Sequence, residues 1–280
     1  MSRPTTQSQE PWSSQPAVPA NRGQVVPSVE RAIGILNTLA SQQLPATLAS
    51  LSQQLELPRS STLALCNTLQ RAGLVVRDGN KMYRLGPSTL ELSRAYLAET
   101  DLHGEFQRLC RKLNVLPEQT LVLGVLNGAD TVYIGQRPGL VPVAMSYELG
   151  LHLPAHCTAT GKALLSALDP DDVQALYGRD DNAILPTLTP KSVNNLPTLV
   201  EQLAEGRERG YTIDDEETSL GMVCVGSPVR DATGSVVGAV ATSMVKAAVG
   251  AKGVSRAASE IRRLAAHLSA ALGDGGNYVR

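Results

Sequence analysis

Residues 57–86 read LPRSSTLALCNTLQRAGLVVRDGNKMYRLG. The first half of this stretch has apolar side chains at helical spacing over 62–72, and Gly73 can end that helix. The second half changes period, because two short apolar runs flank Asp78-Gly79-Asn80. Gly79 is expected to supply the positive φ that a short hairpin turn requires. The stretch therefore predicts a helix followed by a two-stranded antiparallel ribbon.

Two further helices are expected upstream. Apolar residues recur at helical spacing over 29–40, where Ser28 can cap the first turn, and Thr47 can cap a short helix over 48–55. Three helices followed by a hairpin are the order of a winged helix-turn-helix, whose third helix fits the major groove of DNA. Residues 28–86 are predicted to form this domain. Residues 1–27 are polar and rich in Pro, Gln and Ser, which predicts a disordered tail.

Charge is unevenly divided along the chain. Residues 1–86 carry eight Lys and Arg against four Asp and Glu, a net charge of +4, whereas residues 87–280 carry 17 against 22, a net charge of −5. The overall net charge of −1 excludes a wholly basic chromatin-type protein. The positive charge of residues 57–86 comes from Arg59, Arg71, Arg77, Lys81 and Arg84. On the predicted ribbon, Arg77, Lys81 and Arg84 can meet the flanking phosphates of DNA. An ordinary solvated face, or a winged module that binds another protein, are the alternative interpretations of this pattern.

The rest of the chain predicts a second domain that mixes strands and helices. A linker helix is expected over 87–100, a domain over 101–272 and a flexible C-terminus over 273–280. Strands are predicted within 119–147, 222–229 and 235–244, and helices near 162–168, 197–206 and 256–271. The predicted fold class is therefore α+β with two domains, the second an α/β sensor layout.

Short motifs recur along almost the whole chain. Those of the first half are SVERA (28–32), LPRSS (57–61), RAGLV (71–75) and YRLG (83–86). Those of the second half are VYI (132–134), LPAHCTATGKA (153–163), RERGY (207–211), DDEE (214–217), GMVC (221–224) and PVRD (228–231). In their order and spacing, from Ser28 to about Leu272, these motifs resemble the IclR family of bacterial transcriptional regulators.

The resemblance implies an N-terminal winged helix-turn-helix, a linker helix and a C-terminal GAF-like α/β domain that binds an effector. It also implies double-stranded operator DNA, a small-molecule effector and a homodimer or homotetramer as the partners. The expected function is a ligand-responsive, sequence-specific transcriptional regulator. Whether it represses or activates depends on promoter geometry, which the chain does not encode.

The third helix departs from the family pattern. Family members commonly have a large polar or aromatic residue and then an Arg where this chain has Leu63 and Ala64. Because Arg is a common bidentate reader of guanine, this helix has fewer base-reading groups than usual. The remaining candidates are Arg59, Ser60, Ser61, Asn67 and Gln70. The alternatives are contact of Leu63 and Ala64 with thymine methyls, or recognition of DNA shape together with backbone contacts.

The segment 157–162, CTATGK, joins an extended stretch to a helix. Backbone N–H groups and the helix dipole favour an anion at such a helix start, so a small organic acid is the expected effector. By position, the resemblance assigns the effector pocket to Ala159, Thr160, Asp214 and Cys224, with Met145, Leu153 and Leu220 as apolar wall.

Several of these residues also have a purely structural interpretation. Cys224 can be a packed thiol in an apolar strand, and the acidic run 214–217 is typical of a solvated loop. Lys162 is expected to extend its ammonium group to solvent. His156 and Cys157 are expected to point to opposite faces of an extended stretch, which argues against a catalytic dyad.

An enzyme is the main rival function. GAF-like domains can host cysteine redox chemistry, but Cys157 or Cys224 would need a lowered thiol pKa near a cation, which the sequence does not indicate. No catalytic residue, metal site or cofactor is predicted, because the four cysteines form no CxxC pair. Without an apolar signal or membrane-length segment, the chain is expected to be cytoplasmic and not to interact with membranes.

Overall fold

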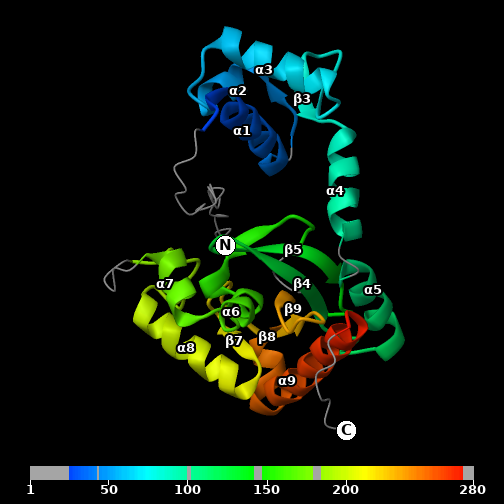
Figure 1. The fold of residues 1–280 in the computed structure, drawn as a ribbon, viewed down its shortest axis with the longest axis vertical. Coiled ribbons are helices and arrows are strands. Elements are labelled where there is room, and N and C mark those ends of the chain that lie inside the picture. The colour runs from blue at the N-terminus through cyan, green and yellow to red at the C-terminus, as the bar shows by residue number, and fades with distance from the viewer. Residues whose placement is uncertain (1–24, 43, 100–101, 142–146, 179–183, 274–280) are drawn as a thin grey trace, which may run out of the picture. The chain divides into compact units, whose positions relative to one another are not determined.

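The computed structural model describes residues 25–42, 44–99, 102–141, 147–178 and 184–273 (Figure 1). The chain forms two compact units that divide between Glu99 and Thr100. The predicted tail, 1–27, and the predicted flexible C-terminus, 273–280, lie almost wholly outside the described residues. Within the described ranges, no helix combines the length and the hydropathy needed to cross a membrane.

The N-terminal unit has the predicted order of three helices followed by a hairpin. Its elements are α1 (Pro27–Ser41), β1 (Ala46–Thr47), α2 (Leu48–Gln54), α3 (Arg59–Arg71), β2 (Val75–Arg77), β3 (Met82–Leu85) and α4 (Ser88–Glu99). The hairpin gains a third strand that the sequence did not predict, because β1 pairs with β3 to give the antiparallel order β1-β3-β2. Helix α4 occupies the stretch where the linker helix is predicted.

Local contacts confirm some predicted turn and cap residues and correct others. The Thr47 hydroxyl accepts the Ser50 N–H at 3.1 Å, so Thr47 caps α2 as predicted. Ser28 does not cap α1, since that helix begins at Pro27, whose fixed φ suits a first helical position. The prediction for Gly79 is wrong: the positive φ of the hairpin turn belongs to Lys81, at 62°. The turn tolerates this because the preceding carboxylate, Asp78, accepts two backbone N–H groups at 2.9 Å.

A compact apolar core holds the winged unit together. Its side chains come from all three helices and from the hairpin, and the fully buried ones are Ile35, Leu51, Cys66, Val75 and Tyr83. Burial of each of the aliphatic members, Ile35, Leu51 and Val75, contributes about 1.5–3 kcal/mol. The core faces inward, which leaves the other face of α3 exposed.

The C-terminal unit is built on one six-stranded antiparallel sheet. Its elements are α5 (Leu102–Leu113), β4 (Thr120–Asn127), β5 (Asp130–Arg137), β6 (His152–Pro154), the 3-10 turn η1 (Ala155–Cys157), α6 (Ala159–Leu165), α7 (Pro170–Tyr177), α8 (Leu196–Arg209), β7 (Thr212–Asp215), β8 (Met222–Arg230), β9 (Val236–Val245) and α9 (Lys246–Ala271). The strand order is β6-β5-β4-β9-β8-β7, and every neighbouring pair is antiparallel. The two-domain α+β class is thus confirmed.

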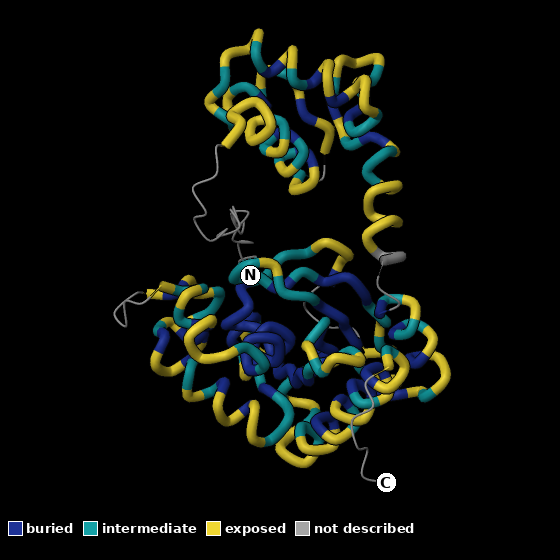
Figure 2. Tube along the Cα trace, viewed as in Figure 1, coloured by how far each residue is buried: buried dark blue, intermediate teal, exposed yellow. Residues whose placement is uncertain are grey.

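Helices cover both faces of this sheet. Gly124 on β4 lies against the Thr160 side chain of α6, whereas Gly135 on β5 lies against the Phe106 ring of α5. Successive residues of a strand face opposite sides, so α6 covers one face and α5, together with α9, covers the other. Helix α6 is buried at every residue, as the dark blue coil in the middle of the unit shows (Figure 2).

The acidic run 214–217 is not the solvated loop that its composition suggests. Asp214 lies in β7, where it is paired with Cys224 of β8 and is 2% exposed. Glu217 is 5% exposed. Two of the four acids are therefore in the interior of the unit.

Candidate functional site

A small cavity lies between the start of α6 and the sheet. Its wall is formed by Val122, Tyr133, Tyr147, Thr158, Ala159, Thr160, Asp214, Thr218, Cys224, Ala241, Thr242 and Ser243. The cavity leaves about 10 Å³ for the centre of a water molecule, which is room for about one water. Its wall combines polar and apolar side chains.

The cavity brings together four of the residues that the resemblance assigned to the pocket, namely Ala159, Thr160, Asp214 and Cys224. Leu153 is half-buried and packs against the apolar cluster that includes Tyr133 and Tyr147. The assignment of Leu220 to the wall is not supported, because its side chain is 58% exposed and the cavity wall does not include it. Met145 lies outside the described residues.

Thr158 fixes the start of α6 at the cavity. Its hydroxyl accepts the Gly161 N–H at 2.8 Å, so this donor is already used. Ala159 and Thr160 lie in the first turn of the helix, where the backbone N–H groups have no acceptor within the helix. They therefore remain the natural donors to an anion at this end of the cavity.

The Asp214 carboxylate forms the acidic part of the wall. It accepts the Glu217 N–H at 2.7 Å, the Thr218 N–H at 3.2 Å and the Thr218 hydroxyl at 2.5 Å. Burial raises the pKa of this carboxyl, and the hydrogen bonds from Thr218 oppose that shift. Asp214 is thus a well-ordered acceptor that faces the cavity.

Two tyrosines and a serine complete the wall, and the sequence did not identify them. The Tyr147 hydroxyl donates to Ser243 Oγ at 3.1 Å, and the Tyr133 and Tyr147 rings meet edge to face with centroids 5.0 Å apart. The Cys224 thiol donates to the same Ser243 oxygen at 3.4 Å. In the sequence, these side chains stood out only by lying in stretches predicted as strands. Such a prediction does not reveal which strands become neighbours in the sheet.

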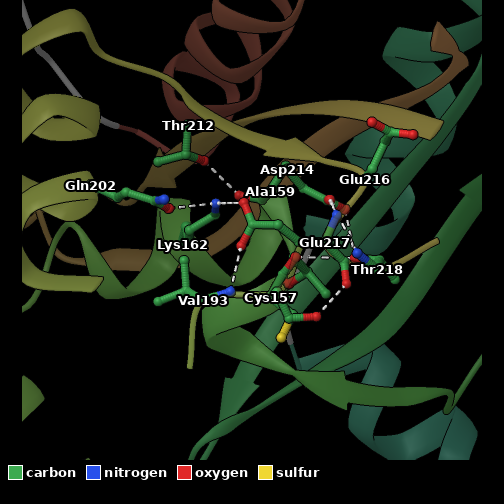
Figure 3. A network of polar contacts seen from close by, with 12 residues as sticks. Cys157, Ala159, Lys162, Val193, Gln202, Thr212, Asp214, Glu216, Glu217 and Thr218 are labelled. Carbon is green, nitrogen blue, oxygen red and sulfur yellow. Dashed lines mark hydrogen bonds and ion pairs between the residues drawn. The ribbon is translucent and has the colours of Figure 1, made fainter. Parts of the chain in front are cut away.

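Lys162 does not extend to solvent as its position in the helix suggested. Its ammonium group is buried and donates to Glu217 Oε1 at 2.5 Å and to Gln202 Oε1 at 2.8 Å (Figure 3). The other Glu217 oxygen accepts the Val193 N–H at 3.4 Å. A buried ion pair therefore joins α6 to α8 and to the turn after β7.

The cysteines of the unit have none of the features of an activated thiol. Burial raises the pKa of Cys157 to about 12 and also raises the pKa of Cys224. The expected opposite orientation of His156 and Cys157 is wrong, because they lie in a 3-10 turn and both approach the Pro186 carbonyl oxygen, at 2.7 and 3.7 Å. Both are buried and pack structurally.

The candidate DNA-contacting residues lie on the surface of the winged unit. Of the nine predicted side chains, the seven other than Ser61 and Arg77 are all exposed: Arg59, Ser60, Asn67, Gln70, Arg71, Lys81 and Arg84. Ser61 is half-buried, and Arg77 is exposed with its guanidinium 5.4 Å from the Tyr83 ring centroid.

The register of the hairpin separates its basic residues. Arg77 is paired with Tyr83, and Arg84 is paired with Val76, so the two arginines lie on opposite faces of the ribbon. Arg84 faces away from the buried Tyr83. Among the described residues, no group of three or more His, Cys, Asp or Glu side chains could hold a metal ion.

Comparison with known proteins gives consistent results for both units. The model described as "IclR helix-turn-helix domain" matches residues 28–79, and that described as "Bacterial transcriptional regulator IclR C-terminal" matches residues 94–270. The HTH-type transcriptional repressor AllR of Salmonella typhimurium is 33% identical over 217 residues, which are 77% of this chain and 79% of AllR.

Solved structures extend the likeness to the fold. The repressor BlcR of Agobacterium tumefaciens is 33% identical, with a TM-score of 0.58 over 90% of this chain and 99% of BlcR. An IclR homologue of Microbacterium hydrocarbonoxydans, complexed with 4-hydroxybenzoate, has a TM-score of 0.72 over 88% of this chain and 98% of its own. At 17% identity, this homologue shows a shared fold alone.

Proposed function

This chain belongs to the IclR family of bacterial transcriptional regulators. We propose that it binds a small organic acid in the cavity beneath α6, and that this binding changes its affinity for operator DNA. The observation that carries the proposal is the small cavity where the first turn of α6 meets Asp214 and Cys224. The cavity holds only about one water molecule, so an effector must displace the wall. A ligand that binds only the conformation with the displaced wall shifts the protein towards that conformation.

The charges around the cavity suggest how the effector is oriented. Among the described residues, Lys162 pairs with Glu217 and no cation forms an ion pair with Asp214, although the Lys162 charge lowers the pKa of the Asp214 carboxyl. A ligand carboxylate beside Asp214 would suffer like-charge repulsion at low dielectric. We therefore place the ligand carboxylate at the N–H groups of Ala159 and Thr160, and a hydrogen-bond donor such as a hydroxyl at Asp214.

The winged unit supplies the DNA contacts in this proposal. Exposed side chains at the start of α3, Arg59 and Ser60 together with the half-buried Ser61, are the candidate base readers, and Asn67 and Gln70 follow on the same helix. Arg71, Arg77, Lys81 and Arg84 are assigned to phosphates, which carry affinity but little sequence information. The register of the hairpin favours Arg84 over Arg77, because Arg77 lies over the Tyr83 ring.

The chain is proposed to act as a homodimer or homotetramer in the cytoplasm. Apolar side chains on two helices of the winged unit are half or more exposed: Val29 and Ile33 on α1, and Leu90, Leu92 and Tyr96 on α4. Such apolar surface is typical of an interface with another chain. The raised thiol pKa of Cys157 and Cys224 argues against the alternative of a cysteine redox enzyme, which needs a thiolate.

The test is DNA retention by the full chain. Binding to the intergenic DNA beside its own gene is measured across a salt series, with unrelated DNA as competitor, and then with 4-hydroxybenzoate and other small carboxylic acids. We expect specific retention that one of these acids changes, and we expect Asp214→Asn to keep DNA binding and lose the response. Equal affinity for both DNAs, with and without every acid, would refute the proposal and favour a partner-binding winged protein.

A further inference from the structure

The buried Lys162–Glu217 pair needs an explanation beyond stability. Both side chains are almost fully enclosed, at 2% and 6% exposure, and neither lines the cavity. Well-packed apolar residues often stabilise a fold as much as a buried ion pair does. The question is therefore which part of the site this pair keeps in place.

Glu217 links the ion pair to the cavity through its own backbone. Its carboxylate is held by Lys162 from α6, while its N–H donates to Asp214 Oδ1 at 2.7 Å. Its carbonyl accepts the Ser192 hydroxyl at 2.7 Å, and the next residue, Thr218, supplies the other two donors to Asp214. Figure 3 shows the pair on one side of the turn and the Asp214 carboxylate on the other.

We propose that Lys162 and Glu217 are positioning residues, which hold the turn after β7 so that Asp214 presents its carboxylate to the cavity. This inference rests on the proposed effector site. Neither residue touches the effector in the proposal, and both act through Asp214. The ion pair fixes where the Glu217 N–H points, and this N–H and the Thr218 donors fix the carboxylate.

Cys224 offers a reporter of the Asp214 position that needs no effector. The two residues are paired in the β7–β8 register and both line the cavity. Burial is the largest cause of the raised pKa of the Cys224 thiol, and the Asp214 charge is the second. Hydrogen bonds with Ser243 and Tyr147 lower this pKa. If Asp214 moves away, the Cys224 thiol should ionise at lower pH.

The experiment follows the alkylation of each cysteine of the full chain by iodoacetamide between pH 7 and pH 10.5, with peptide mass spectrometry as the readout. The variants are Asp214→Asn, Glu217→Gln, the combination of both, and the apolar pair Lys162→Met/Glu217→Leu. Glu260→Gln, at the exposed Arg263–Glu260 pair of α9, is the matched control. Cys66 and Cys110 report general loosening of the fold within the same sample.

We expect Glu217→Gln to accelerate Cys224 alkylation about tenfold at fixed pH, because a thiol that is less affected by the Asp214 charge forms more thiolate. Asp214→Asn should do the same, and the combination should add nothing further. Glu260→Gln should match the wild type. If Glu217→Gln accelerates the alkylation of all four cysteines together, the fold has loosened. The apolar pair variant, which removes both charges of the ion pair, is then judged by the same criteria.

Two results would overturn the inference. The first is a pH dependence of Cys224 alkylation that Asp214→Asn shifts but that stays as in the wild type in both Glu217→Gln and the apolar pair variant. The second is an acceleration by Glu217→Gln that is as large in the Asp214→Asn background as in the wild type, because the effect would then not pass through Asp214. Because the assay contains no ligand, a failure of every acid to change DNA binding would refute the effector proposal separately.

Discussion

Gly226 on β8 lies directly against Ala159, the first residue of α6. A Cβ atom on Gly226 would be 2.4 Å from the Ala159 carbonyl oxygen and 2.6 Å from its carbonyl carbon. The same carbonyl oxygen accepts the Thr212 hydroxyl at 2.6 Å, so it is held from β7 as well. The start of α6, and with it one wall of the cavity, is thus fixed by a close approach of two backbones.

Gly226→Ala is expected to destabilise the C-terminal unit. The added methyl group meets backbone atoms that cannot rotate away, so we expect a loss of about 1–3 kcal/mol in the free energy of unfolding. Urea unfolding followed by circular dichroism measures it. Gly104→Ala on α5 is the control, since a Cβ there meets nothing within 4 Å, and Ala should stabilise the helix by about 0.5–1 kcal/mol. Equal stability of the two variants would contradict the close-approach argument.

Thr47→Ala is expected to destabilise the winged unit by about 1 kcal/mol, because the Ser50 N–H loses its capping acceptor. Thr68→Ala makes the same chemical change inside α3, where the hydroxyl only donates back to the Ala64 carbonyl. That control should be neutral or slightly stabilising, since Ala is the better helix former. The melting temperatures of both variants, measured by calorimetry, provide the check, and a lower value for Thr68→Ala than for Thr47→Ala would be contradictory.

The elements with strong local signals were predictable from the sequence. The helix 62–72 and the strands that follow have different periods, so their order could be predicted without a partner. Strand β1 could not, because two residues show no period. Gly79 was a reasonable turn residue, but its neighbour Asp78 satisfies the turn and lets Lys81 take the positive φ instead.

The cavity could be predicted only in part, because its wall depends on contacts between distant residues. Ala159 and Thr160 follow a helix-start pattern that the sequence shows directly. The pairing of Lys162 with Glu217 joins residues 55 positions apart, and composition alone made both look solvent-exposed. Tyr147 lies outside the strands and meets Ser243 of β9 from 96 positions away, which no local pattern reveals.

Arg84→Ala is expected to weaken DNA binding without changing sequence preference. Arg84 is exposed on the face of the hairpin that points away from Tyr83, where it suits a phosphate contact. Losing one such contact should lower affinity for specific and unrelated DNA alike and reduce the salt slope by about 1. Arg111→Ala, an exposed change on α5, should leave both values unchanged. Fluorescence anisotropy across a salt series measures them, and a changed base preference would contradict the phosphate assignment.

Lys162→Met is expected to be far more damaging than a change in an exposed ion pair. It leaves the Glu217 carboxylate buried without its cation, which costs about 3–5 kcal/mol in the free energy of unfolding. Lys162→Met/Glu217→Leu removes both charges and should recover most of this loss. Arg263→Met, at a pair whose side chains are 45% and 31% exposed, should be close to the wild type. A double variant no more stable than Lys162→Met would contradict the argument that the uncompensated Glu217 charge causes the loss.

Glu216 is expected to make the C-terminal unit lose stability in acid. Hydrogen bonds from Lys191 and then Lys246, with the Gly221 N–H, lower the pKa of this carboxyl from 4.5 to about 2 in the folded state. A carboxyl whose pKa is lower when folded stabilises the fold above its unfolded pKa, and this contribution is lost as the pH falls. The loss should occur between about pH 4.5 and pH 2.

Glu216→Gln tests this directly, because glutamine keeps the size of the side chain at a backbone position with a φ of 65°. The variant should melt at a lower temperature than the wild type at pH 6, and the difference should shrink as the pH falls towards 2. Lys191→Met and Lys246→Met each remove one cause of the low pKa, so each should show part of the same convergence. Parallel curves for wild type and Glu216→Gln over the whole range would mean that the Glu216 charge does not stabilise the fold.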